Sequence, residues 1–288
     1  VVPGKSFLSD LDRQLDPVAQ ELAKVCAADP VCGAKLGPDP WARLQDIMRA
    51  LAQGHCPTFA HRDVLRRGDF LPGREDRIHM LALLYRLERC TPEDIGVVER
   101  YFDAWLSTRP IPGSGTGDSF ALMMNVTFSE LWPRPVPSTA ELVARCEDQL
   151  FCPGVGVALS ALSDAWRRYP LDRYYDSPFR TRTPVLMLHG ELDTQTPVAL
   201  ARALAEQLNA RHQTLVTIPY GTHAAAFSSP VRTKGVPNCG TQLLASFVGN
   251  PRGRLDTSCL GDLRPPFEID QQLKQSLFGD ADLWENEP

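Results

Sequence analysis

The feature that most restricts the fold of this chain is an abrupt change of sequence pattern near Arg182. From Ser6 to about Tyr169, apolar residues recur at intervals of three and four, as on the buried face of amphipathic helices. Beyond the change, Val185–Leu188 is a short unbroken apolar run with the length of a strand that is buried on both faces of a parallel sheet. We therefore expect a long helical part followed by a part that contains a sheet.

The helical part is predicted to consist of separate helices divided by breaks rich in proline and glycine. The first has Asp10 and Asp16 in helix-start positions and Pro17 in its first turn. Further helices are expected over residues 41–51, 74–87, 92–106, 119–131, 139–150 and 157–168. No self-similar period is present in the sequence, so a solenoid of repeats is not expected.

The sheet part has the pattern of one strand–helix–strand unit. Residues 189–193 form a turn after the first strand, and Pro197 suits the first turn of an amphipathic helix over residues 198–208. A second strand follows at residues 214–218. Two strands joined through a helix are parallel, and their crossover is right-handed. The expected fold class is α/β, with two parallel strands and their helices beneath a large all-helical lid.

Two residues of catalytic type, Asp193 and His223, follow the two strands. The carboxyl ends of neighbouring parallel strands meet at one edge of a sheet, so these side chains can come together although they are distant in sequence. A carboxylate beside an imidazole fixes its tautomer and stabilises the imidazolium that forms when the histidine accepts a proton from a nucleophile. Each residue alone also has an ordinary explanation, as a helix cap or a loop residue. Together they match the serine–acid–histidine order of α/β-hydrolases.

Composition and charge exclude several other classes of function. With 288 residues, 43% of them hydrophobic, the chain is long enough for one or two domains. Its net charge is only −5 and its arginines are scattered among acids, so we expect neither nucleic acid nor a membrane as a partner. No apolar run reaches the ~18–20 residues that span a bilayer, and no charged-then-apolar leader opens the chain. A peptide or another small molecule is the expected ligand.

The chain has eight cysteines, an even number whose spacing favours disulfides. Pairing neighbours in the sequence predicts four bonds, Cys26–Cys32, Cys56–Cys90, Cys146–Cys152 and Cys239–Cys259. Zinc-type C-x2-C spacings are absent, and the metal-like group of His55, Cys56 and His61 is expected to be a surface loop with one disulfide cysteine. We expect no cofactor and no metal. Because disulfides persist in oxidising compartments, a secreted or periplasmic location is expected; buried free cysteines in a cytosolic protein are the alternative.

The motifs around the acid and the histidine resemble a known enzyme family. Residues 184–193 with Thr196-Pro197, residues 218–223, Cys239-Gly240 and residues 255–259 are similar to the carboxyl-terminal region of the tripeptidyl-aminopeptidase-like branch of the prolyl-aminopeptidase family. Residues 26–32 resemble the start of the lid in such enzymes, and residues 1–4 resemble the segment after their sixth sheet strand.

The resemblance implies an α/β-hydrolase in which Asp193 is the triad acid and His223 the triad base. It divides the chain into the end of an upstream hydrolase core (1–4), a helical lid (5–180) and the carboxyl-terminal part of the core with its disulfide-closed tail (181–288). The expected activity is that of a serine exopeptidase that releases amino-terminal residues or tripeptides, with a lidded esterase as the alternative.

The nucleophile of that family lies in a G-x-S-x-G elbow, and this sequence contains no such motif. Gly113-Ser114-Gly115 is the nearest string, but it stands in a proline-flanked stretch that we interpret as a linker; Ser160 and Ser163 lack flanking glycines. Either an upstream half of the enzyme supplies the serine as a partner, or the chain is a binding module derived from such an enzyme. We prefer the first, because an acid and a base in triad order serve no purpose in a pure binding module. The chain alone is then expected to be inactive.

The lid is expected to select the substrate. By the resemblance, residues 125–132 are the lid segment that approaches the active site, and Glu130 is the candidate that binds the free ammonium of a peptide. The alternative for Glu130 is a solvent-facing acid on a helix.

Overall fold

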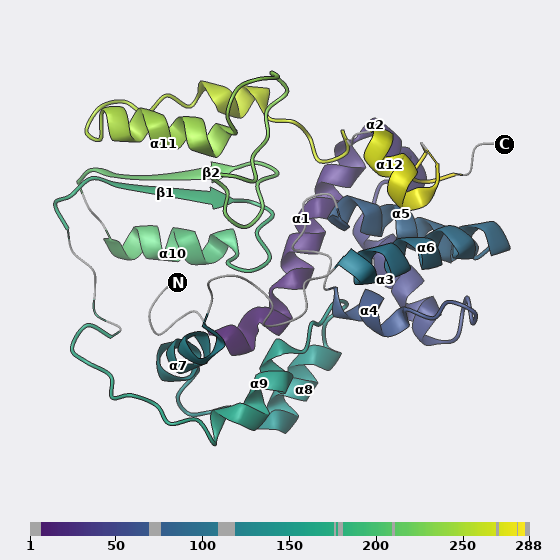
Figure 1. Ribbon diagram of the computed structural model, residues 1–288, viewed down its shortest axis with the longest axis horizontal. Coiled ribbons are helices and arrows are strands. Elements are labelled where there is room, and N and C mark those ends of the chain that lie inside the picture. Colours follow the sequence, from purple (N-terminus) through teal and green to yellow (C-terminus); the bar gives the residue numbers. More distant parts are fainter. Residues whose placement is uncertain are drawn as a thin grey trace.

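The computed structural model describes residues 7–68, 76–108, 119–175, 177, 181–208, 211–268, 271–280 and 282–285. A helical region comprises the 3-10 helix η1 (Leu8–Arg13) and the helices α1 (Leu15–Ala28), α2 (Pro30–Leu36), α3 (Pro40–Ala52), α4 (Arg62–Arg67), α5 (Asp76–Arg89), α6 (Pro92–Thr108), α7 (Phe120–Glu130), α8 (Thr139–Glu147) and α9 (Val155–Ser163). The following elements are β1 (Val185–Gly190), α10 (Val198–Leu208), β2 (Gln213–Ile218), α11 (Cys239–Gly249), the 3-10 helix η2 (Ser258–Asp262) and α12 (Gln271–Phe278). Figure 1 shows the sheet with its helices on one side and α3 to α6 on the other, with α1 between them.

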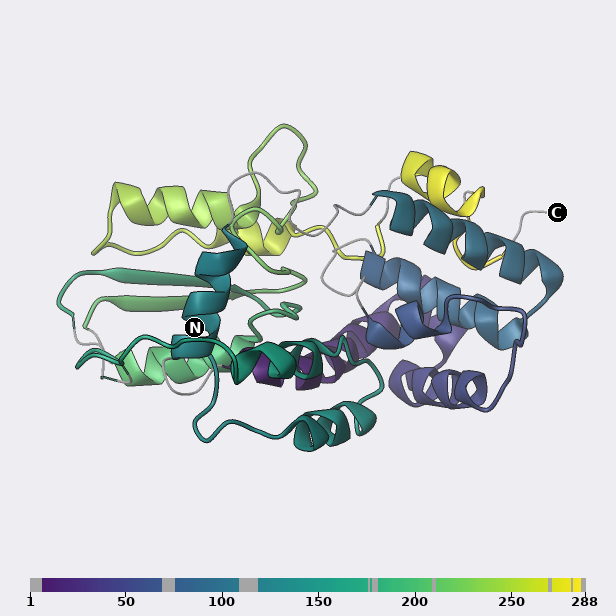
Figure 2. The ribbon, with the colours of Figure 1, turned by 60° about the horizontal axis from the view of Figure 1, so that its bottom comes forward.

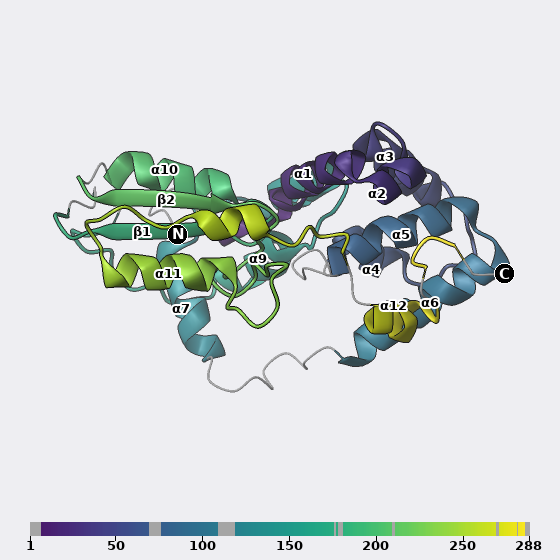
Figure 3. The ribbon, with the colours of Figure 1, turned by 90° about the horizontal axis from the view of Figure 1, so that it is seen from above.

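The two strands and three of these later elements form an α/β region, residues 181–262. β1 and β2 are parallel, from Val185 opposite Gln213 to Gly190 opposite Ile218. Helix α10 connects them on one face of the sheet, and α11 lies on the other face (Figures 1 and 3). On the α11 side, Ile218 packs in a buried cluster with Leu243 and the Cys239 end of α11. This arrangement matches the strand–helix–strand unit expected from the sequence.

The burial of β1 differs from the expectation. The apolar run predicted a strand buried on both faces, but Val185–His189 are half-buried and only Gly190 is buried. The reason is that β2 is the only strand paired with β1 among the described residues. One edge of β1 therefore carries no strand in the described part of the chain.

The helical region contains two apolar cores. Helices α1, α3, α5 and α6 enclose the larger one, which includes Leu22, Leu44, Leu83 and Phe102. Helices α7 and α8 enclose the smaller one, with Met124, Phe128, Trp132 and Leu142. Helix α1 joins the larger core, and its N-terminal neighbour η1 packs against α8 and α9. Helices are thus the only regular secondary structure among the described residues between 7 and 177, and non-helical connections separate them.

The last described segment does not stay with the α/β region to which the sequence assigned it. Helix α12 packs on α6 (Figures 2 and 3), and Phe278, Leu283 and Trp284 enter the larger helical core. The fully buried Arg86 guanidinium donates hydrogen bonds to the Leu283 carbonyl (2.8 Å) and to the Asp94 carboxylate (3.1 Å). The chain therefore returns to the helical region after the α/β region.

Four disulfides join Cys26 to Cys32, Cys56 to Cys90, Cys146 to Cys152 and Cys239 to Cys259, the same pairs that the order of the cysteines predicts. Such bonds suggest an oxidising, extracellular environment. None of the helices in the described ranges is both long and apolar enough to span a bilayer. Residues 1–4 and Gly113-Ser114-Gly115 lie outside the described residues.

Candidate active site

The turn after β1 fixes the carboxylate of Asp193. This side chain is almost fully buried, with 3% of its surface exposed. One carboxylate oxygen, Oδ1, accepts hydrogen bonds from the backbone N–H groups of Gln195 and Thr196, both at 2.9 Å. The other oxygen, Oδ2, accepts a hydrogen bond from the Thr196 hydroxyl at 2.8 Å. These donors satisfy a buried charge and hold it in one orientation.

A second histidine supports the same turn. The His189 Nε2 atom is hydrogen-bonded to the Thr196 carbonyl and lies 3.7 Å from Asp193 Oδ2. This contact holds Thr196 in place, and Thr196 in turn holds the acid. Neither supporting role was predicted from the sequence, although Thr196-Pro197 belongs to the motif that carries the resemblance.

His223 meets Asp193 from the turn after β2. Its Nδ1 atom lies 3.1 Å from Asp193 Oδ2 and 3.3 Å from Oδ1. Because a carboxylate only accepts, Nδ1 carries the hydrogen in the neutral ring, and Nε2 is left as the acceptor. The side chain is 44% exposed, and Nε2 has no hydrogen-bond partner among the residues that the structure describes. The two residues that the sequence singled out are therefore in contact in the geometry of an acid–base pair.

Two glycines allow the two turns to touch. The Leu192 N–H donates to the Gly221 carbonyl at 2.9 Å. A Cβ atom on Gly190 would lie 2.3 Å from the Gly221 carbonyl oxygen, which is closer than any real contact. Only glycine permits this approach, and the approach brings Asp193 and His223 within hydrogen-bonding distance.

Helix α11 holds the segment after His223 against the sheet. The buried Ser229 hydroxyl donates to the Ala225 carbonyl (2.7 Å) and accepts from the Gly240 N–H (2.8 Å). A Cβ atom on Gly240 would lie 2.5 Å from the Ala225 carbonyl oxygen, so the helix packs closely on this segment. The Cys239–Cys259 disulfide fixes the same end of α11. The Cys239-Gly240 motif thus supports the histidine turn.

His223 opens into a mainly apolar cavity of about 220 Å³. The cavity lies between the α/β region and the start of the helical region, and its lining includes Leu8 and Leu11 of η1, Leu131 and Leu200. Thr196 and Gln195 are its polar neighbours from the acid turn. An apolar cavity beside the free face of an imidazole can receive an apolar acyl group of a substrate.

Glu130 does not contact the Asp193–His223 pair. It lies at the end of α7 as an exposed residue and accepts a hydrogen bond from the Tyr169 hydroxyl. Burial and this hydrogen bond raise the pKa of Tyr169 to about 12. Glu130 and Tyr169 line a second pocket of about 330 Å³, with Asp172 and the rings of Tyr174 and Tyr175. Leu131 lines both this pocket and the His223 cavity, so the two are neighbours.

The described residues contain no credible metal site. The closest group of ligand-type atoms is Asp12 with Cys146 and Cys152, but the two sulfurs form a disulfide. The Asp12 oxygens accept hydrogen bonds from the N–H groups of Val155 (2.8 Å) and Gly156 (2.9 Å). The metal-like group of His55, Cys56 and His61 is likewise engaged in other contacts. Cys56 is bonded to Cys90, and His55 Nε2 lies 3.0 Å from the Leu87 carbonyl.

Comparison with known proteins agrees with the expectation for the carboxyl-terminal part. Residues 158–259 match the family model described as TAP-like protein, and this range includes both Asp193 and His223. No curated protein matches the chain, and no solved structure matches it. Residues 158–259 are therefore similar to TAP-like proteins, in agreement with an α/β-hydrolase.

Proposed function

We propose that this chain supplies the acid, the base and the lid of a serine exopeptidase. The observation that carries the proposal is the contact of the buried Asp193 carboxylate with His223 Nδ1 at 3.1 Å. This contact leaves Nε2 free to accept a proton. A family match over the same residues supports hydrolase chemistry at this site.

The proposed reaction uses a serine from an upstream half of the hydrolase core. His223 Nε2 accepts the proton of the serine hydroxyl as its oxygen attacks the carbonyl carbon of the scissile bond. Asp193 stabilises the imidazolium. The same proton then passes to the leaving amine as its bond to carbon breaks, which leaves an acyl-enzyme. Water repeats the two steps and releases the acid, with the serine hydroxyl restored.

Glu130 is the proposed anchor for the free amino terminus of the substrate. Its exposed carboxylate stands in a pocket with a second acid, Asp172, and three tyrosines. Carboxylates bind an ammonium through charge-assisted hydrogen bonds, and tyrosine faces attract cations. Because Leu131 separates this pocket from the His223 cavity, an ammonium here and an acyl group beside His223 belong to one extended substrate.

The first test measures covalent labelling by a fluorophosphonate probe, which reacts with an activated serine. Residues 1–288 alone should not label, whereas co-expression with the upstream half should give labelling and amidase turnover. In that complex His223→Ala should abolish both, and Asp193→Asn should lower kcat by on the order of 10⁴, as replacing the triad carboxylate with a carboxamide does in another serine protease. His212→Ala is the matched control, because His212 lies outside the described pockets. Full labelling of His223→Ala, or stoichiometric labelling of the isolated chain, would refute the assignment.

The second test separates an exopeptidase from an esterase. Glu130→Gln should lower kcat/KM about tenfold or more for peptides with a free amino terminus, since it removes the charge that holds the ammonium. It should leave amino-blocked amides and simple esters unchanged. Glu147→Gln, a substitution of an exposed acid at the end of α8, controls for net charge. Equal effects on free and blocked substrates would favour the esterase and overturn the role of Glu130.

A further inference from the structure

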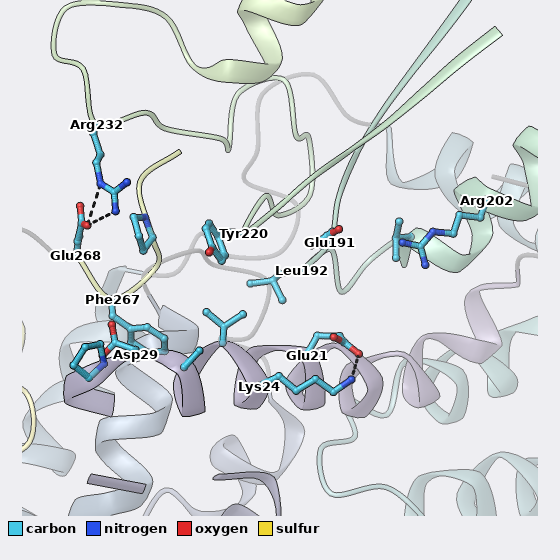
Figure 4. Close-up of a pocket in the computed structure, with 15 residues that line it drawn as sticks. Glu21, Lys24, Asp29, Glu191, Leu192, Arg202, Tyr220, Arg232, Phe267 and Glu268 are labelled. Atoms are coloured by element: carbon cyan, nitrogen blue, oxygen red, sulfur yellow. Dashed lines mark hydrogen bonds and ion pairs between the residues drawn. The ribbon is translucent and has the colours of Figure 1, made fainter. Parts of the chain in front are cut away.

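A large cavity, separate from the His223 cavity, lies behind the turns that carry Asp193 and His223. It has a volume of about 740 Å³ and is bounded by α1 on one side and by the turns after β1 and β2 on the other. Leu192, next to Asp193, and Tyr220, at the end of β2, form its centre (Figure 4). The residues that line the His223 cavity do not line this one.

The middle of the cavity is apolar. Val25 and Ala28 of α1 face it from one side, and Leu192, Val198 and Phe267 complete the lining. Leu192 is only 2% exposed and also belongs to the larger helical core, so this floor is a fixed part of the structure. A surface of this kind suits an aliphatic or aromatic side chain of a small ligand.

Two pairs of opposite charges at the rim neutralise each other. Lys24 is 2.7 Å from Glu21, and Arg232 is 2.9 Å from Glu268 (Figure 4). All four side chains are about half exposed or more. Exposed ion pairs of this kind contribute little to the free energy of folding. Each pair has no net charge, so any net charge at the rim comes from the other lining residues.

Three further charged residues line the cavity: Asp29, whose carboxylate accepts hydrogen bonds from the first turn of α2, and Glu191 and Arg202 at the other end. The half-buried Glu191 side chain and the exposed Arg202 side chain make no hydrogen bond or ion pair with any residue that the structure describes, nor with each other. Figure 4 shows both at the same end, with the Arg202 guanidinium extending from α10 towards the cavity. An anion and a cation that line one cavity without neutralising each other are complementary to the α-ammonium and the α-carboxylate of one ligand.

We propose that this cavity binds a free α-amino acid with an apolar side chain. Arg202 pairs with its carboxylate, Glu191 pairs with its ammonium, and the side chain lies on Leu192 and Val25. The proposal does not rest on the proposed exopeptidase activity, because its evidence and its test concern binding alone. A ligand here contacts Leu192 and Tyr220, which belong to the turns that carry Asp193 and His223. Tyr220 already has a left-handed backbone, with φ of 61°, which is uncommon for a tyrosine and marks this turn as strained.

The test is calorimetric titration of the full chain, in its soluble complex with the upstream half, with L-leucine, L-leucinamide and N-acetyl-L-leucine. L-Leucine should bind, and either derivative should bind about tenfold more weakly or worse, because each lacks one of the two charges. Arg202→Gln and Glu191→Gln should each weaken L-leucine binding by a similar factor. Arg211→Gln is the matched control, since Arg211 is an exposed arginine just beyond α10 that does not line the cavity.

Three results would overturn the proposal: no binding of L-leucine, equal binding of the amide or the acetyl derivative, or equal losses in Arg202→Gln and Arg211→Gln. Glu130→Gln distinguishes this site from the pocket beside Tyr169. Binding that survives Glu130→Gln and fails in Arg202→Gln supports the cavity behind the turns, whatever the outcome of the labelling experiments. Binding lost in Glu130→Gln alone assigns L-leucine to the Glu130 pocket and refutes this proposal.

Discussion

Gly190 and Gly221 set the distance between the turns that carry Asp193 and His223. A Cβ atom on Gly190 would meet backbone atoms of Gly221 at 2.3 and 2.4 Å, and backbone cannot move aside as a flexible side chain can. We therefore expect Gly190→Ala to destabilise the fold by about 1–3 kcal/mol or more, as overpacked sites do. The free energy of unfolding in urea is the measurement.

Gly96→Ala is the matched control for that substitution. Gly96 lies within α6 and is exposed. A Cβ atom added there would have no neighbouring atom within 4 Å. Alanine is a better helix former than glycine by about 0.5–1 kcal/mol, so this variant should be slightly more stable than the parent chain. If Gly190→Ala unfolds at the same urea concentration as Gly96→Ala, the close approach of the turns is not a constraint.

The Thr196 hydroxyl is the only side-chain donor to Asp193 besides His223 in the described structure. Thr196→Val keeps the shape of the side chain and the backbone hydrogen bond but removes the donor, so we expect a loss of about 1–2 kcal/mol in unfolding free energy. Thr233→Val, at an exposed threonine, should change stability by far less. Equal stabilities of the two variants in urea would show that this hydroxyl does not hold the acid.

The acid and the base could be found from the sequence, whereas their supports could not. Asp193 and His223 follow strands that are marked by apolar runs, and the edge of a parallel sheet brings such residues together. The hydrogen-bond partners of Asp16 show what sequence patterns cannot predict. The sequence places Asp16 at a helix start, but its side chain instead accepts hydrogen bonds from the N–H groups of Leu150 (2.7 Å) and Phe151 (2.9 Å). Contacts between such distant segments leave no local pattern.

Several of the expected helices agree with the structure, and one helix of the α/β region was missed. The expected helices over residues 92–106 and 119–131 correspond to α6 and α7, and the helix over residues 198–208 is α10 with the same bounds. Helix α9 ends at Ser163, before the expected limit of residue 168. Helix α11 was not predicted: it has a glycine in its first turn and another at its end, and Asn238 makes no side-chain cap. Its packing on the sheet compensates for these weak local signals.

The segment after α12 is held to α5 by charge, and this contact should be sensitive to acid. Burial acts to raise the pKa of Glu285, but hydrogen bonds from Lys35, Tyr85 and Arg89 outweigh burial and lower this pKa to about 2. The folded state therefore favours the charged carboxylate. Its contribution to stability is complete above pH 4.5 and is lost as the pH falls from about 4.5 towards 2.

The measurement is the unfolding midpoint in urea at several pH values between 7 and 2. The parent chain should lose more stability over the acid range than Glu285→Gln, because the amide cannot lose a charge. Glu147→Gln, which removes an exposed acid on α8, should follow the parent curve. Parallel curves for all three chains would show that the contacts of Glu285 do not contribute to folding.

At the scale of the whole molecule, the open edge of β1 is a surface on which chains can associate. One edge of β1 carries no strand in the described ranges, and Val185–His189 are only half-buried. Unpaired strand edges with apolar side chains template pairing with other strands. We expect residues 1–288 alone to form oligomers or aggregates, and the chain co-expressed with an upstream half to form a soluble particle. Analytical ultracentrifugation distinguishes the two; a monodisperse monomer of the isolated chain would contradict the prediction.

A substitution on β1 tests whether the chains associate through this strand. Met187 lies in the middle of β1 and is half-buried. Met187→Lys places a charge there and should reduce self-association, as charged residues do on natural sheet edges. Met123→Lys, at an exposed methionine of α7, should have a smaller effect. A larger effect at Met123 would locate the associating surface on α7.

The return of the tail to the helical region has a consequence for how the chain is made. Arg86 is fully buried and donates to Asp94 within the helical region and to the carbonyls of Asp282 and Leu283, which are synthesised much later than α5 and α6. A ribosome that has finished α6 has not yet made these two carbonyls. The larger helical core therefore reaches its final hydrogen bonding only after a segment nearly two hundred residues downstream of Arg86 has left the ribosome.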